Sequence, residues 1–303
     1  MTKDTDGTLF GIGDLARSTG VPVRTIRFYC DEGILESRRS EGGHRRFDAS
    51  AVDRLNLVRS LRNLGMGLPA IAHVLTGERS VAEAVAAERA ALDVELAALA
   101  WRHASLRAIE EAAPSERAAR LDLLSAAGGG RAAREALVAF WRRVILSPLR
   151  PEVFDTFVAM NVPDPPADPT TRQVVAYAEM VALVGDRSLT RRLQARSWAN
   201  RKQIPDENAL VIGIGTAAEL ALPLMGTGRA PDLALDCFVT THASARGRRD
   251  TPAFRRELLA NSALDRDPAV QRYWTLTTEI THGPVSPGSI LAWLLDALER
   301  SLT

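Results

Sequence analysis

The sequence predicts a protein dominated by α-helices, with one small β-hairpin near its N-terminus. Apolar residues recur at helical spacing over most of the chain, and residues 79–113 contain neither Pro nor Gly. Alternating strand patterns are missing, and only the apolar run 209–214 could be argued as a strand. At 303 residues the chain is long enough for about two domains.

Residues 9–77 are predicted to form a compact head. A short helix at 13–18 ends at Gly20, and a second helix begins after Pro22, which the first helical turn tolerates because it needs no N–H there. Gly33 supplies a left-handed C-cap, and Gly42-Gly43 fits the tip of a basic hairpin at 37–47. This order of helix, turn, helix and basic ribbon is that of a winged helix-turn-helix, whose second helix is shaped to enter the DNA major groove.

Two further helices complete the head. Asp48 is a suitable N-cap for a helix that runs to Leu64, and the helix at 68–75 follows a Gly65-Met66-Gly67 break. Their inward positions at helical spacing are Val52, Leu55, Val58, Leu61, Leu64, Ile71, Val74 and Leu75. The head therefore closes on its own small core.

Residues 78–113 are predicted to form one dimerisation helix, roughly 50 Å long at ~1.5 Å per residue. An apolar seam at steps of seven residues, with Leu96 beside it, consists of Val85, Leu92, Leu99 and Leu106. A second copy of the same helix is the simplest partner for this seam, which predicts a homodimeric coiled coil. The alternative is that the seam packs on the chain's own C-terminal domain.

Residues 114–130, which end in three glycines, are predicted to be a linker, and 131–303 a helical regulatory domain. Several of its helices begin with Pro or follow Asp, Ser or Thr. The expected helices are 131–146, 151–160, 170–184, 188–201, 205–225, 231–244, 251–263, 268–281 and 286–302.

Composition narrows the functional classes. The net charge of +1 argues against non-specific coating of nucleic acid, so affinity for DNA has to come from a local patch such as the arginines between Arg17 and Arg62. Two cysteines are too few for a disulfide framework. Residues 1–8 are expected to be a disordered tail and not a signal peptide, and no apolar run is expected to approach the ~20 residues of a membrane span. We therefore expect a cytoplasmic protein without membrane contact.

Four motifs of the first third of the chain belong together: Val23-Arg24-Thr25-Ile26-Arg27-Phe28-Tyr29, Gly33-Ile34-Leu35, the wing Gly43-His44-Arg45-Arg46-Phe47 and the Gly65-Met66-Gly67-Leu68 break. In these motifs and their order, the chain resembles the MerR family of transcription regulators. It implies a homodimer joined by antiparallel long helices and bound to an inverted repeat in a promoter. In this family the dimer bends and untwists the DNA when an effector is bound, so that RNA polymerase can engage both promoter elements.

The resemblance also assigns roles to residues of the head. Arg24 and Thr25 are expected at base edges, and phosphate contacts are expected from Arg27, Tyr29, Arg45 and Arg46. For Tyr29 the alternative is that its ring packs under the wing. Phe28 stands where Tyr is frequent, and Cys30, where Glu is frequent, is interpreted as a small buried apolar residue.

The C-terminal domain shows no catalytic constellation, and we expect neither a metal nor a cofactor. No cysteine occurs between residues 79 and 131, which disfavours thiophilic-metal sensing. Aromatic residues could line a pocket for a small organic effector: Trp141, Tyr177, Trp198, Tyr273 and Trp274. The alternative is that each is an ordinary core residue.

Two other functions stay open at this point. The helical domain could modify or sequester a small molecule, or the head could be an architectural DNA binder without any effector. Cys237 could trap an electrophilic ligand, although a lone buried cysteine is usually inert.

Overall fold

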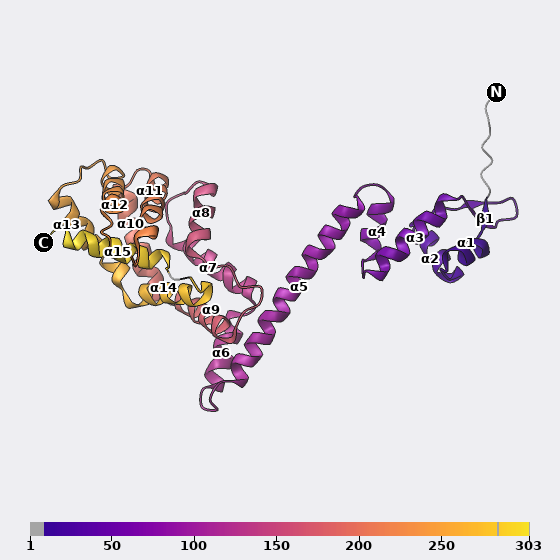
Figure 1. Cartoon of the computed structure of the whole chain (residues 1–303), viewed down its shortest axis with the longest axis horizontal. Helices are drawn as coiled ribbons and strands as arrows, with labels where there is room; N and C mark the ends of the chain where they lie inside the picture. Colours follow the sequence, from indigo (N-terminus) through magenta and orange to yellow (C-terminus); the bar gives the residue numbers. More distant parts are fainter. Residues whose placement is uncertain (1–8, 284, 303) are drawn as a thin grey trace, which may run out of the picture. The chain divides into compact units, whose positions relative to one another are not determined.

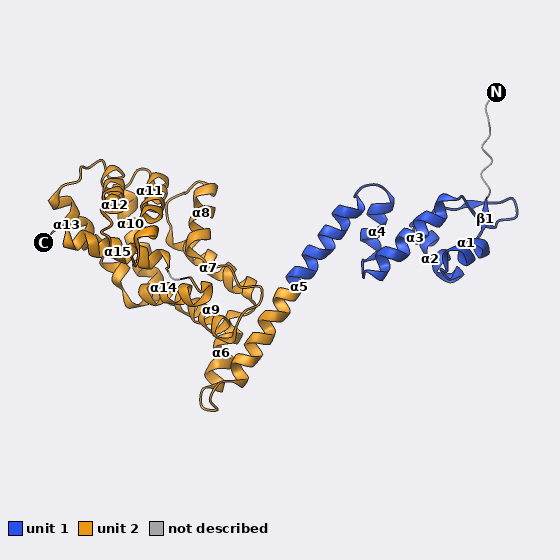
Figure 2. Ribbon diagram, viewed as in Figure 1, with its two compact units in different colours: residues 1–95 blue, residues 96–303 orange. Residues whose placement is uncertain are grey.

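The computed structural model describes residues 9–283 and 285–302, so the expectation for residues 1–8 lies outside the described part of the chain. The chain divides into two compact units, residues 1–95 and 96–303 (Figure 2). Helices dominate the described residues, and their strands form a single three-stranded sheet near the N-terminus (Figure 1). The prediction of an all-α-dominated fold with a small wing is confirmed.

The first unit contains a helix-turn-helix and a wing. Its elements are β1 (Phe10–Gly11), α1 (Ile12–Thr19), α2 (Val23–Asp31), β2 (Arg38–Arg39), β3 (Arg45–Phe47), α3 (Ser50–Asn63) and α4 (Leu68–Leu75). The antiparallel sheet has the order β1-β3-β2. Gly20, at φ 68°, ends α1 in the left-handed conformation. Leu15, Ile26 and Leu55 are fully buried, so one core holds the two helices and the wing together.

Helix α5 (Val81–Glu110) begins with a capping box. The Ser80 hydroxyl accepts from the Glu83 N–H at 3.2 Å, and the Glu83 carboxylate accepts from the Ser80 N–H at 2.8 Å. One face of its C-terminal half is buried within the second unit through Trp101, Ala104 and Ala108.

The predicted seam lies on another part of the α5 surface. Its five side chains are between 39% and 63% exposed: Val85, Leu92, Leu96, Leu99 and Leu106. The described residues therefore do not support the alternative, in which the chain's own C-terminal domain covers this seam.

The stretch 114–130, expected as a linker, contains the helix α6 (Arg117–Ala127). Helix α6 packs on α9 (Thr171–Val184), with Leu124 and Ala127 buried. The three glycines at 128–130 indicate a linker, but they mark only a break at the C-terminal end of this helix. Leu124 and Ala127 are three residues apart, and this helical spacing of apolar residues is the pattern that indicates α6.

The remaining helices of the second unit follow the predicted order. They are α7 (Gly130–Val144), α8 (Pro151–Asn161), α10 (Arg187–Gln203), α11 (Glu207–Ala221), α12 (Asp232–Ser244), α13 (Pro252–Asn261), α14 (Pro268–Thr281) and α15 (Pro287–Arg300), with 3-10 turns at Leu222–Leu224 and Ala263–Arg266. The run 209–214 lies within α11, so the helix predicted over 205–225 is found there and the strand alternative is excluded. Two buried clusters form, one around Tyr177 on α9 and one around Phe238 on α12.

One stretch is more apolar than the sequence analysis allowed. The 18 residues Glu207–Leu224 reach a mean hydropathy of 1.2, which meets the limits of length and composition for a membrane span, and 17% of the stretch is buried.

Candidate nucleic-acid interface

Helix α2 presents a polar face to solvent and an apolar face to the core. Arg24 and Arg27 are exposed, while Ile26 is fully buried. The Tyr29 ring is only 8% exposed and packs in the core of the first unit, which is the alternative that the sequence left open for it. Phe28 is 46% exposed, so its ring is available beside the arginines.

The wing places arginines opposite arginines. In the register of β2 and β3, Arg38 pairs with Arg46 and Arg39 pairs with Arg45. Like charges directly opposite each other destabilise an antiparallel pair. An anion bound beside the wing would relieve this repulsion, so the hairpin is suited to a negatively charged partner.

A groove of about 460 Å³ lies between the wing, α2 and the start of α1. The residues that line it are Gly11, Ile12, Arg27, Arg39, Gly43, His44, Arg45 and Arg46. Four of these side chains are guanidinium groups, which bind phosphate oxygens through forked hydrogen bonds. The groove therefore joins two of the predicted wing residues to Arg27 of α2, and it adds Arg39, which the sequence analysis did not assign.

One groove arginine has a partner within the protein. Arg45 Nη2 donates to Asp31 Oδ1 at 2.5 Å, which ties the wing to the last residue of α2. Neighbouring Cys30 is half-buried, and burial raises the pKa of its thiol, while the Arg45 charge opposes that rise. Sequence reasoning missed Asp31, because only the fold of the wing brings it to a residue 14 positions away.

The predicted effector residues do not form one site. Trp141 donates to the Tyr273 hydroxyl at 2.9 Å and lies 6.3 Å from Trp274, centroid to centroid. Tyr273 in turn donates to the Asn161 carbonyl at 2.7 Å, so these rings satisfy one another inside a core. Tyr177 belongs to the same buried cluster, beside Trp101, whereas Trp198 is 54% exposed on α10.

The fold and the basic groove define residues 9–77 as a winged helix-turn-helix, a class of domain that reads DNA. The model of the "MerR HTH family regulatory protein" matches residues 10–78. The chain carries a MerR-family helix-turn-helix domain over this range.

Curated relatives match about a quarter of the chain. The nodulation protein NolA of Bradyrhizobium sp. (strain NC92) is 37% identical over 87 residues, which are 28% of this chain and 37% of that protein. The HTH-type transcriptional activator TipA of Streptomyces coelicolor is 40% identical over 67 residues, 22% of this chain and 26% of that protein.

A third relative is the HTH-type transcriptional regulator ZntR of Escherichia coli K12. It is 36% identical over 69 residues, 22% of this chain and 49% of that protein. The chain thus spans between about a quarter and a half of the length of these relatives.

Proposed function

We propose that this protein is a cytoplasmic transcription regulator that binds an inverted repeat in a promoter as a homodimer. The observation that carries the proposal is the groove between α2 and the wing, where four guanidinium groups meet. Two of the similar proteins are a transcriptional activator and a transcriptional regulator, which supports the proposal. In this proposal the protein is not an enzyme.

Within the proposal, the residues of α2 and those of the wing make different contacts with DNA. Exposed Arg24 and the neighbouring Thr25 read base edges, because they lie on the outward face of α2. Arg27 on α2 and Arg45 and Arg46 on the wing hold phosphates and fix the register of the domain on the duplex. Tyr29, whose ring lies in the same core as Phe47 of β3, supports the packing of the wing on the head.

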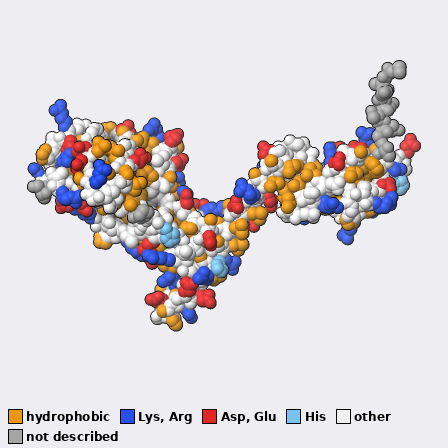
Figure 3. Space-filling view, in the orientation of Figure 1, with side chains coloured by type: hydrophobic (Ala, Val, Ile, Leu, Met, Phe, Trp, Pro, Cys, Tyr) orange, Lys and Arg blue, Asp and Glu red, His pale blue; other side chains and the backbone are white. Residues whose placement is uncertain are grey.

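The exposed seam of α5 supports the homodimer. Apolar side chains repeated every seven residues remain uncovered along this helix, and Figure 3 shows apolar atoms at its surface. A facing copy of α5 would bury them and would place two heads on one duplex. An effector, a small organic molecule, would then change the DNA distortion imposed by the two heads and so the engagement of RNA polymerase.

Replacement of Arg45 tests the proposed interface. We expect Arg45→Ala to weaken binding of the full-length protein to duplex DNA from its own promoter and to lower the slope of log K against log salt by about 1, because one phosphate contact is lost. Fluorescence anisotropy over a salt series measures both quantities. Arg131→Ala, at an exposed arginine of α7, is the control and should bind like the wild type. Equal binding by the wing variant and the wild type at every salt concentration would contradict the contact assignment.

A further inference from the structure

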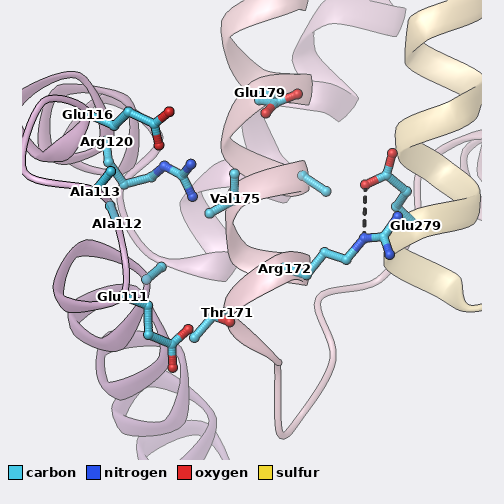
Figure 4. Close-up of a pocket in the computed structure, with 12 residues that line it drawn as sticks. Glu111, Ala112, Ala113, Glu116, Arg120, Thr171, Arg172, Val175, Glu179 and Glu279 are labelled. Carbon is cyan, nitrogen blue, oxygen red and sulfur yellow. Dashed lines mark hydrogen bonds and ion pairs between the residues drawn. The ribbon is translucent and has the colours of Figure 1, made fainter.

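A second cavity lies within the C-terminal unit, at the end of α5. It has a volume of about 320 Å³, which is within the lower range of small-ligand pockets, roughly 300–1,000 Å³. Its walls come from the end of α5, the start of α6, the first turns of α9 and one residue of α14 (Figure 4). Ala108, Ala112, Val175 and Ala176 give it an apolar floor.

Most charges around this cavity are already compensated. Glu111 accepts from Arg107 at 2.7 Å. Arg272 donates to both Glu179 and Glu279, and Arg172 also donates to Glu279, at 3.4 Å. These carboxylates therefore bring little unbalanced charge to the site.

Arg120 is different. Its side chain is half-buried and reaches from α6 toward the cavity (Figure 4), and among the described residues no ion pair or hydrogen bond of its guanidinium is found. The nitrogens of this guanidinium are not buried, so they are accessible to a ligand, and a carboxylate can bind them with two parallel hydrogen bonds. On the same wall, Glu116 is exposed and also has no ion pair in the described chain.

We propose that this cavity binds a small zwitterion, a molecule with one carboxylate and one ammonium group on an apolar frame. The carboxylate pairs with Arg120, the frame lies on the alanine and valine floor, and the ammonium group faces the carboxylate of Glu116. A polyanion is disfavoured because Arg120 is the one cationic side chain of this lining that lacks an acceptor among the described residues. A simple cation is disfavoured because it would leave Arg120 without an acceptor.

The position of the cavity gives the ligand a structural consequence. A bound zwitterion would bridge α6 to α9 next to the last turn of α5, the helix that carries the proposed dimer seam. That the zwitterion acts as the effector rests on the proposed function, whereas the binding of the zwitterion to the cavity does not.

Direct titration of the full-length protein, without DNA, tests the binding. The probes are the protein amino acids, and each one that binds is compared with its deaminated acid and its decarboxylated amine. We expect at least one amino acid to bind at millimolar concentration or below, and both counterparts to bind about tenfold more weakly or worse, because each lacks one charged contact. Calorimetry measures the affinities, and the melting temperature should rise with bound ligand.

Two variants test whether the amino acid binds in this cavity. Arg120→Gln should lose about tenfold or more in affinity for the amino acid that binds. Arg131→Gln, at an exposed arginine outside the cavity, should bind like the wild type. The proposal is overturned if no amino acid binds, if the deaminated or decarboxylated counterpart binds equally well, or if Arg120→Gln keeps full affinity. DNA binding measured separately shows whether the proposed function stands in each case.

Discussion

Asp31 and the DNA phosphates are alternative partners for the same guanidinium. Arg45 lines the basic groove, yet it already donates to Asp31. Because Arg45 is about one quarter exposed and Asp31 is 62% exposed, this ion pair is well solvated, and a surface pair of this kind contributes at most about 1 kcal/mol. A phosphate group could therefore displace the carboxylate at small cost.

Removal of the Asp31 charge tests this competition. We expect Asp31→Asn to raise affinity for duplex DNA by severalfold and to steepen the salt dependence, because it frees Arg45 and removes a negative charge beside the phosphates. Anisotropy titrations against Asp53→Asn, an acid on α3, provide the comparison. Weaker binding by Asp31→Asn would mean that Arg45 only positions the wing.

The lowered pKa of His242 predicts that the second unit is less stable in acid. Burial, assisted by the charge of Arg246, lowers the pKa of His242 to about 3, and its Nδ1 lies 3.1 Å from Arg246 Nη1. Since the unfolded chain binds a proton near pH 6.5 and the folded chain does not, this contribution to stability is complete above pH 6.5 and is lost as the pH falls toward 3.

We expect the free energy of unfolding to fall by about 2 kcal/mol between pH 7 and pH 5 through this residue. Urea unfolding of the wild type and of His242→Gln at both pH values isolates the effect, because the variant lacks the titrating group. A pH dependence that is identical in both proteins would show that His242 titrates normally in the fold.

Helix α11 contains two glycines with opposite environments. A Cβ at Gly213 would lie 2.4 Å from the Thr241 methyl carbon, whereas a Cβ at Gly215 would meet nothing within 4 Å. Gly213 thus permits the close packing of α11 on α12, and Gly215 has no such role. Both glycines lie inside the helix.

Alanine at each glycine should have opposite effects. Gly213→Ala is expected to destabilise the protein by about 1–3 kcal/mol, because it overpacks the contact with Thr241. Gly215→Ala should stabilise it by up to about 1 kcal/mol, because alanine is the better helix former. Chemical denaturation of both variants measures the difference, and equal effects would show that α11 and α12 are not in close contact.

The complete protein depends on whether the α5 seam finds a partner. Among the described residues, seven large apolar side chains of α5 are exposed in the single chain, and five of them form the seam. A contiguous apolar surface of this kind marks an interaction site. A coiled-coil dimer removes that exposure and at the same time pairs the two DNA-binding heads.

Charge in the seam should separate the protomers. We expect the double variant Leu92→Glu, Leu99→Glu to be monomeric by light scattering and to bind an inverted repeat far more weakly than the wild type. Leu121→Glu is the matched control, because Leu121 is an exposed leucine on α6, outside the seam. A wild-type chain that is monomeric at micromolar concentration would remove the basis for the proposed dimer.

Local chemistry allowed much of the structure to be predicted. Gly20 and Gly33 end α1 and α2 as expected, at φ 68° and 72°. The nine helices predicted beyond residue 130 are found in the described residues, most of them within three residues of the expected bounds. Helix α6 was not predicted, because its apolar pattern is weak and three glycines follow it. Of the aromatic residues proposed for a ligand, four pack in one core and Trp198 is exposed.

The sequence by itself determined the order of the elements, the basic head and the apolar heptads of α5, because caps, turns and periodicity act between residues close along the chain. Only the tertiary structure decided that Asp31 holds Arg45, that Trp141 and Tyr273 satisfy each other, and that Arg120 faces a cavity without a partner. Each of these contacts joins residues from different elements, and such contacts are set by how the helices pack, which no local pattern in the sequence specifies.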